Sequence, residues 1–344
     1  MRKIAIAGAG AVGGLIAWHL VKAGHDPVLV ARPASAGVLR RDGLTLVGDT
    51  GAGRLTVKVT SQPHDLGPQD LVLAGFKAQD WPQGLAQVLP LMGPHTLLVP
   101  LLNGVPWWFF QGFGGEHEGR SVGAVDPDGL LARSFNPAQI VGAVLYVAAS
   151  REGPARILWN GRNRIVLGAP LPGRGEAAEA VSRLLAGAGL GAETTGDIRN
   201  ALWLKLLGNA AFNPLSVAAQ ANMGRLLTHP PLYAILREMV AEAIRAGQAL
   251  GLACATSPEE RLQLPASMHG FKTSMLQDFE AGRRLELGGI VDALAELAGL
   301  AGVPVPMIAA IGALAAEASA RQTPPSAPGN NCLKNGQSPE LPEP

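Results

Sequence analysis

Apolar runs alternate with helical patterns along the first half of the chain. A helical pattern over residues 11–23 separates two apolar segments, which predicts a βαβ unit near the N-terminus. A second helical pattern, over 79–90, separates the next two. We expect buried strands over residues 2–7, 27–31, 71–75 and 96–101. This alternation is typical of a doubly wound α/β sheet.

Turn residues predict hairpins beside this sheet. Segments 44–47 and 54–60 alternate in polarity around a glycine- and aspartate-rich turn, so we expect them to pair. Asp126-Pro127-Asp128-Gly129 is a strong turn signal, and it predicts a second hairpin over 119–134. Further along the chain, we expect strands over 140–149 and 164–168 and a helix over 174–188.

After Gly196 the pattern changes to helices alone. The helical stretches cover residues 198–220, 230–251, 258–281, 286–300 and 305–320. We therefore expect a Rossmann-type α/β domain over 1–195 and an all-α domain over 196–321. Residues 322–344 contain six prolines and few apolar side chains, so we expect a disordered tail there.

The composition narrows the class of partner. The 344 residues include 28 Lys and Arg against 27 Asp and Glu, which gives no electrostatic case for nucleic acid or an anionic membrane. No apolar run reaches the roughly 18 residues of a spanning helix. The two cysteines form no disulfide framework, which is typical of a reducing compartment. We expect a cytoplasmic protein. The alternative is a signal peptide, because Met1-Arg2-Lys3 precedes an apolar run.

A glycine-rich turn joins the first expected strand to the first helix. Its sequence, Gly8-Ala9-Gly10-Ala11-Val12-Gly13, has the GxGxxG spacing. The first glycine allows a tight turn, the second lets the backbone approach a pyrophosphate, and the third lets the helix pack on the strand. The helix N-terminus then offers free N–H groups to phosphates. This context predicts a dinucleotide site.

The end of the second strand indicates which dinucleotide binds. An NAD site carries an Asp or Glu there for the ribose 2′-hydroxyl. Here the strand ends in Ala31-Arg32, and the next acid is Asp42. Because a guanidinium suits a 2′-phosphate, we expect NADP(H) as the cofactor. The alternative is that Arg32 is a solvated surface residue.

One polar stripe interrupts an otherwise apolar helix over 198–213. At about 100° per residue, Asn209 and Asn213 lie about 40° and 80° from Lys205. A helix apolar on all sides is buried, so this stripe must face a cleft or a polar partner. The alternative is a satisfied polar cluster between helices. Pro214 is expected to kink or end the helix just beyond Asn213.

Glu286 stands out in the same way on the expected 286–300 helix. It shares its face with apolar residues, so its carboxylate needs a cationic or hydrogen-bonding partner. Lys205 is the natural candidate. A purely structural ion pair is the alternative.

Three other motifs carry no expected chemistry. Gly119-Arg120-Ser121-Val122-Gly123 matches GxSxG but lies in the expected hairpin and not at a strand-to-helix elbow. The seven histidines show no metal-ligand spacing. The aromatic run Trp107-Trp108-Phe109-Phe110 has no basic patch beside it, so we expect it to pack in a core or an interface.

Taken together, these residues resemble the ketopantoate reductase (2-dehydropantoate 2-reductase) family, within the 6-phosphogluconate-dehydrogenase-like group. The resemblance spans about residues 1–320. It rests on the glycine turn, Phe76-Lys77-Ala78, Leu102-Asn103-Gly104, Trp203-Leu204-Lys205-Leu206 with Asn209, Asn213-Pro214-Leu215, the 269–278 segment and Glu286. The chain departs from the family pattern at Gly288-Gly289, because family members usually carry an Asp two residues after the glutamate. Residues 112–139 and the Trp107-Trp108 run resemble a longer subgroup of the family.

The resemblance implies a role for each matching residue. Lys77 and Asn103 would contact the cofactor near the nicotinamide, and Lys205 would be the catalytic lysine. The residues expected to hold the substrate and tune the lysine are Asn209, Asn213, Ser274 and Glu286.

The expected activity is NADPH-dependent reduction of a small 2-oxo acid, ketopantoate to pantoate in the first instance. A reductase of another 2-oxo acid and an opine-type dehydrogenase stay open, as does a non-catalytic NADPH sensor. A homodimer is also left open.

Overall fold

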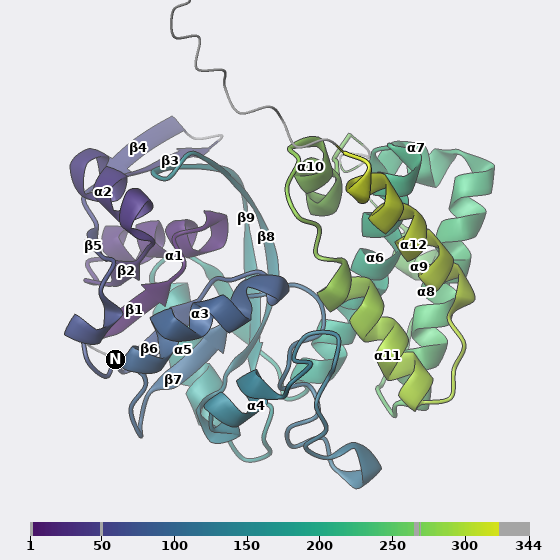
Figure 1. The fold of residues 1–344 in the computed structure, drawn as a ribbon, viewed down its shortest axis with the longest axis horizontal. Helices are drawn as coiled ribbons and strands as arrows, with labels where there is room; N and C mark the ends of the chain where they lie inside the picture. The colour runs from purple at the N-terminus through teal and green to yellow at the C-terminus, as the bar shows by residue number, and fades with distance from the viewer. Residues whose placement is uncertain (1–2, 49–50, 265–267, 269, 323–344) are drawn as a thin grey trace, which may run out of the picture.

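The computed structural model describes residues 3–48, 51–264, 268 and 270–322. Two sheets with their helices form one half of the molecule, and helices alone form the other (Figure 1). The prediction of an α/β domain followed by a helical domain is confirmed. The expected tail lies outside the described residues, apart from Gln322. No helix within the described ranges is both long and apolar enough to cross a bilayer.

The first sheet is wholly parallel, with the strand order β5-β2-β1-β6-β7. Its strands are β1 (Ile4–Ala7), β2 (Val28–Val30), β5 (Lys58–Thr60), β6 (Leu71–Ala74) and β7 (Leu97–Pro100). The associated helices are α1 (Ala11–Lys22), α2 (Pro33–Asp42) and α3 (Trp81–Val88). Because all five strands run the same way, the loops that follow β1, β2, β6 and β7 meet at one edge, where ligands of such sheets bind.

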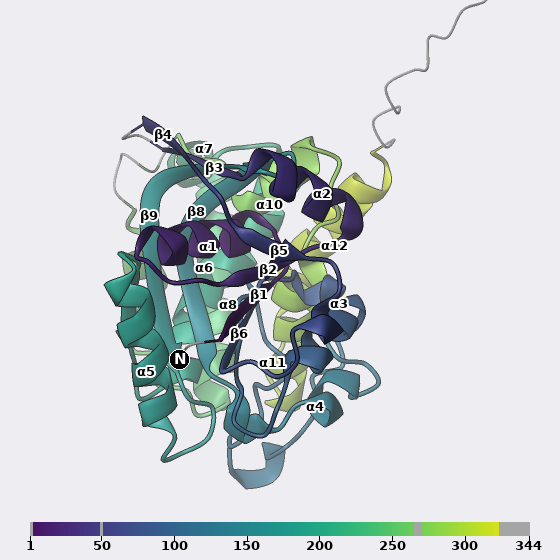
Figure 2. The same cartoon turned by 90° about the vertical axis from the view of Figure 1, so that its left-hand side faces the viewer.

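The second sheet is mixed and curves over α1 (Figure 2). Its strands are β3 (Leu44–Gly48), β4 (Gly51–Leu55), β8 (Gly142–Glu152), β9 (Arg156–Gly168) and β10 (Gly191–Thr194), and α5 (Gly175–Gly187) precedes β10. The predicted 44–47/54–60 hairpin is confirmed in part. β3 and β4 pair antiparallel, but residues 58–60 leave the hairpin and join the first sheet beside β2.

The helical half is built around α6 (Ile198–Ala219). Its other helices are α7 (Met223–Thr228), α8 (Pro230–Ala249), α9 (Pro258–Leu262), α10 (Ser274–Glu280), α11 (Ala293–Leu300) and α12 (Pro306–Ala320). Helices α8, α10 and α12 pack on α6, so most of its surface is buried. Pro214 does not end α6, which continues to Ala219.

Two predicted elements are wrong. Residues 119–134 form no hairpin but turns followed by α4 (Leu130–Ser134). The buried carboxylate of Asp126 accepts hydrogen bonds from the N–H groups of Leu131 and Ala132, which starts a helix where a strand was expected. The 258–281 stretch is not one helix. The helix α9 ends at Leu262, and α10 begins at Ser274 with Thr273 as its N-cap.

The aromatic run is part of the core, as predicted. Trp107, Trp108, Phe109 and Phe110 are all almost fully buried. The rings of Trp81 and Trp107 lie 4.4 Å apart, and Phe135 packs on both. Phe109 also contacts Trp203 of α6, so the run joins the two halves of the molecule.

Candidate active site

The glycine turn has the geometry that its sequence predicts. Gly8 has a φ of +92°, and a Cβ there would lie 2.8 Å from the carbonyl oxygen of Gly75. At Gly13 a Cβ would lie 2.2 Å from the Gly8 carbonyl oxygen. No L side chain fits either position without moving the backbone. These two glycines therefore let α1 start directly against the end of β1.

The N-terminus of α1 is open. Gly10 is its N-cap residue and offers no side-chain cap, and the first turn contains no acid. A Cβ at Gly10 would meet one atom only, the Gly75 carbonyl oxygen at 3.8 Å. The N–H groups of Ala11 and Val12, at the start of the helix, have no intrahelical partners. A pyrophosphate fits here, because it would accept from these groups and gain from the helix dipole.

Arg32 follows β2 at the same edge of the sheet. It is the N-cap residue of α2, and its side chain is exposed. No acidic residue lies between the end of β2 and Asp42, which is paired with Arg41. In the part of the chain that the structure describes, Arg32 has no ion-pair partner. The guanidinium is thus free for an anion at the position where a ribose lies in folds of this kind.

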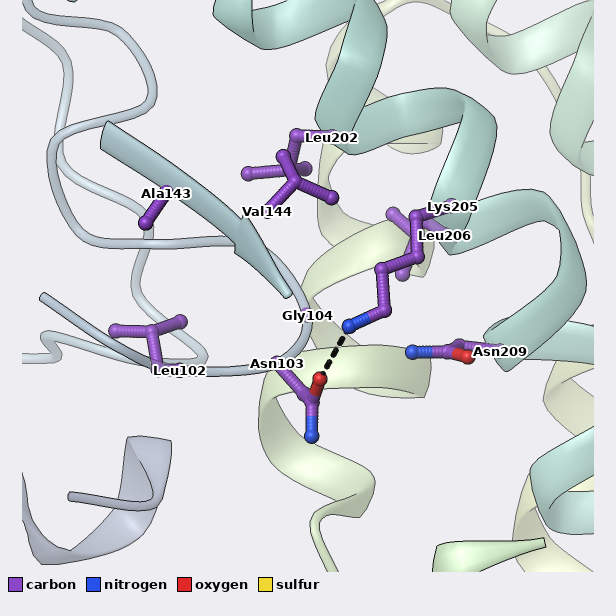
Figure 3. A pocket seen from close by; sticks show the side chains of 9 residues that line it. All are labelled: Leu102, Asn103, Gly104, Ala143, Val144, Leu202, Lys205, Leu206 and Asn209. Carbon is purple, nitrogen blue, oxygen red and sulfur yellow. Dashed lines mark hydrogen bonds between the residues drawn. The ribbon is translucent and has the colours of Figure 1, made fainter. Parts of the chain in front are cut away.

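A narrow cleft separates the sheet edge from α6 (Figure 3). The loop after β7, the start of β8 and one face of α6 form its walls. Most of the lining is apolar, and the polar side chains are those of Asn103, Lys205 and Asn209. The lining residues are Leu102, Asn103, Gly104, Ala143, Val144, Leu202, Lys205, Leu206 and Asn209. Lys205 and Asn209 of the predicted polar stripe of α6 therefore face a cleft, whereas Asn213 is not among its lining residues.

Lys205 is held at the mouth of this cleft by contacts from the other half of the chain. Its ammonium donates to Oδ1 of Asn103 at 2.6 Å and to the carbonyl oxygen of Leu145 (Figure 3 shows the first contact). It also lies 5.7 Å from the centre of the Tyr146 ring. Burial lowers the pKa of Lys205 to about 8, and the negative charge of Glu286 opposes the shift. The lysine therefore reaches its protonation midpoint at mildly alkaline pH and is mostly protonated at neutral pH.

Glu286 lies just before the helical segment that leads into α11, and it is 7% exposed. Burial raises the pKa of its carboxyl, while the charges of Lys77 and Lys205 and a hydrogen bond from Asn103 oppose this. The expected direct ion pair with Lys205 is not among the contacts of the described residues. Instead, Oδ1 of Asn103 accepts from Lys205, and the Asn103 side chain also acts to lower the pKa of Glu286.

Gly289 brings the helical half into contact with the sheet edge. A π-helical segment, Gly288–Asp292, precedes α11, and the Gly289 carbonyl accepts from the N–H of Val105 at 2.8 Å. Gly104 has a φ of +81°, and a Cβ there would lie 2.1 Å from the Gly289 oxygen. The two glycines permit a backbone-to-backbone contact beside Asn103. The glycine pair Gly288-Gly289, at which the chain departs from the family pattern, therefore lies at the contact between the two halves of the molecule.

Lys77 binds a carboxylate of the helical half. Its ammonium is paired with Asp278 of α10, whose other oxygen accepts from Arg283 at 2.7 Å. Asp278 ends the 269–278 segment of the family resemblance, but no role was predicted for it. Its position on the apolar face of α10, beside Met275 and Phe279, indicates that this carboxylate needs a partner.

Asn213 and Ser274 lie where α6 meets α10. Asn213 is 5% exposed, and its backbone carbonyl accepts from Ser216, whose hydroxyl also bonds that of Thr273 at 2.6 Å. Ser274 follows Thr273 as the exposed first residue of α10. The structure thus links the Asn213 and Ser274 segments. Of the expected site residues, only Asn103, Lys205 and Asn209 line the same cleft.

A Rossmann-type sheet with an open glycine turn, and a partly buried lysine facing its edge from a helical domain, define a dinucleotide-dependent oxidoreductase. The family model described as "Ketopantoate reductase PanE/ApbA" matches residues 4–171, and its "C terminal" counterpart matches residues 197–319. The chain therefore belongs to the ketopantoate reductase family, and it is an oxidoreductase of that family.

Individual relatives span nearly the whole chain. A 2-dehydropantoate 2-reductase of Mesorhizobium japonicum is 37% identical over 313 residues, which cover 91% of this chain and 96% of the relative. The crystal structure of the 2-dehydropantoate 2-reductase of Geobacter metallireducens is 27% identical, with a TM-score of 0.81 over 92% of this chain and 99% of that one. A D-mandelate dehydrogenase solved with NADH and anilino(oxo)acetate shares the fold, with a TM-score of 0.80 at 20% identity and coverage of 92% and 98%.

Proposed function

We propose that this enzyme uses NADPH to reduce a 2-oxo acid, and that its substrate is 2-dehydropantoate, which becomes (R)-pantoate. The observation that carries the proposal is the cationic Lys205, held by Asn103 in an apolar cleft at the carboxyl edge of the parallel sheet. Ketone reduction needs a proton donor at such a place, because negative charge develops on the carbonyl oxygen.

The cofactor assignment rests on residues at the sheet edge. The α1 N-terminus with Gly10, Ala11 and Val12 would bind the pyrophosphate, and Arg32 would bind the 2′-phosphate. Lys77 and Asn103, in the loops after β6 and β7, would lie beside the nicotinamide. When bound, the reduced nicotinamide supplies a hydride to C2 of the substrate.

Lys205 would act as the general acid. Its pKa of about 8 keeps an ammonium available at neutral pH while making it a stronger acid than an ordinary lysine. The ammonium stabilises charge on the keto oxygen and then donates its proton there. Asn103 and the Leu145 carbonyl orient the ammonium through two of its three N–H groups, which leaves the third for the substrate.

Glu286 would keep Lys205 charged, acting through its negative field and through Asn103. The substrate's carboxylate and hydroxyl would be bound by Asn209, Asn213 and Ser274. Asn209 has the strongest support, because it lines the cleft next to Lys205. The apolar walls from Leu102, Val144 and Leu206 suit a short branched aliphatic chain such as that of ketopantoate.

The test is to follow NADPH absorbance with a panel of 2-oxo acids. The panel contains ketopantoate, unbranched 2-oxo acids and phenylglyoxylate, and each is also tried with ammonia or an amine. We expect the highest kcat/KM with ketopantoate and no requirement for an amine. A higher value for another member would reassign the substrate, and amine dependence would indicate an opine-type dehydrogenase. NADPH binding without turnover of any member would favour a sensor.

A further inference from the structure

The end of the β8–β9 hairpin reaches the glycine turn. Gly14, in the first turn of α1, has no side chain, and a Cβ there would lie 2.9 Å from the side chain of Ile157. Ile157 of β9 is 1% exposed, and its cross-strand partner on β8 is Arg151. Paired residues project from the same face of a sheet. The packing of Ile157 on α1 therefore directs Arg151 toward the loop between β1 and α1.

Arg151 makes one contact there. Its Nη1 donates to the carbonyl oxygen of Ala9 at 2.8 Å, within the GxGxxG turn and 142 residues away in sequence. A guanidinium has five N–H donors, so most of the N–H groups of Arg151 have no acceptor among the described residues. No carboxylate in the described ranges pairs with Arg151. The neighbouring carboxylate, that of Glu152, is paired with Arg156.

A second positive charge lies close by. The pKa of Arg151 is lowered by burial and further by the charge of Arg32, so the two guanidiniums repel each other. Neither has an acidic partner among the residues described. An anion bound between two unpaired like charges beside a phosphate-binding turn would be stabilised by both of them. A phosphate monoester carries close to two negative charges at neutral pH, which matches this pair.

We propose that Arg151 is a second cofactor-binding arginine, which binds the 2′-phosphate of NADPH together with Arg32. The inference rests on the proposed use of NADPH and adds to it a residue from a different sheet. Arg32 approaches from the end of β2, and Arg151 approaches from β8, where it contacts the Ala9 carbonyl of the glycine turn. The nicotinamide end of the cofactor is not involved.

The test compares ligands with and without a 2′-phosphate. NADPH and NADH are titrated by fluorescence, and adenosine 2′,5′-bisphosphate and 5′-AMP by calorimetry. Arg151→Ala should weaken NADPH and the bisphosphate about tenfold, while NADH and AMP change by less than about twofold. Arg151→Lys, which keeps the charge, should lose less. Arg156→Ala is the matched control, because it removes a positive charge from the same hairpin end and should leave all four affinities unchanged.

Each alternative outcome has a separate meaning. Equal weakening of both members of each pair would place Arg151 at the pyrophosphate or in the support of the turn, and would overturn the proposal. Unchanged affinities in Arg151→Ala, with NADPH still preferred over NADH, would overturn the role of Arg151 and leave the assignment of the cofactor intact. If the unmodified enzyme bound NADPH and NADH equally, the choice of cofactor and the role of Arg151 would both be wrong.

Discussion

Asn103 and Lys205 are hydrogen-bonded across the boundary between the two halves of the chain, with Oδ1 of the amide 2.6 Å from the ammonium nitrogen. Asn103 belongs to the loop after β7, and Lys205 belongs to α6. The contact ties the proposed acid to the sheet edge at which a nicotinamide is expected. The position of the lysine is therefore fixed by the cofactor domain as well as by its own helix.

Replacing Lys205 should abolish most of the activity. Lys205→Ala removes the proposed proton donor, so we expect kcat to fall by a factor of about 10² or more. The dissociation constant of NADPH should barely change, because the phosphates bind at the other domain. Steady-state rates and a fluorescence titration measure the two effects. A near-normal kcat would mean that the lysine is structural.

The pH dependence of the reaction should report the pKa of Lys205. The acid must be protonated, so kcat/KM for reduction should fall as the pH rises through about 8. Glu286 raises the pKa of Lys205, so Glu286→Gln should move this alkaline limb to lower pH. Rates measured from pH 6 upward, on the unmodified enzyme and the variant, test this directly. An unmoved limb would show that Glu286 does not act on the lysine.

Arg32 should decide the choice of cofactor. NADPH should bind at least about tenfold tighter than NADH, which corresponds to about 1.4 kcal/mol, and Arg32→Ala should remove most of that difference. The control is Arg40→Ala, which removes another exposed arginine of the same helix. Fluorescence titrations of each protein with each cofactor give the result. If Arg40→Ala lowered the preference as much, overall charge would be the cause.

The Gly104–Gly289 contact should tolerate no side chain. Gly104→Ala places a Cβ against the Gly289 oxygen, so we expect a loss of more than about 3 kcal/mol in the free energy of unfolding or failure to fold. Gly114→Ala is the matched control. Its φ is +79°, but nothing lies within 4 Å of the added Cβ, so it should lose only the conformational cost of about 1 kcal/mol. Denaturant unfolding compares the two variants.

The Lys77–Asp278 pair should contribute to docking of the two halves. The Asp278 side chain is 12% exposed and serves both Lys77 and Arg283, so Asp278→Asn should cost about 1–3 kcal/mol of stability. Glu280→Gln breaks an exposed pair with Lys272 near the same helix and should cost less than about 1 kcal/mol. Equal costs in thermal or denaturant unfolding would show that the buried pair has no special role.

The sequence predicted those parts of the site that depend on local structure. The glycine turn and the polar stripe of α6 follow from spacing over a few residues. The turn is present, and Lys205 and Asn209 of the stripe line the cleft. The missed contacts join distant positions. Arg151 and Ala9 are 142 residues apart, Lys77 and Asp278 are 201 apart, and no periodicity reveals such pairs.

Side chains that act on the backbone were a second source of error. Asp126 has the sequence signature of a turn, but both of its carboxylate oxygens accept from N–H groups of α4. A turn signal does not distinguish a hairpin from a helix start, because aspartate favours both. The need of Glu286 for a partner was predicted, but the effect of Asn103 on it was not, because Asn103 comes from the other domain.

Strand β8 contacts both the proposed proton donor and the glycine turn of the proposed cofactor site. The Leu145 carbonyl binds the ammonium of Lys205, and Arg151, six residues further along, binds the glycine turn. At about 3.3 Å per residue, the two contacts are up to about 20 Å apart along the strand. The number of residues between Leu145 and Arg151 therefore sets the distance between the contact with Lys205 and the contact with the glycine turn. Deleting one residue between them, at the irregularity near Val147 and Ala149, would shift Arg151 by about 3.3 Å and turn its side chain to the other face of the sheet, away from the glycine turn.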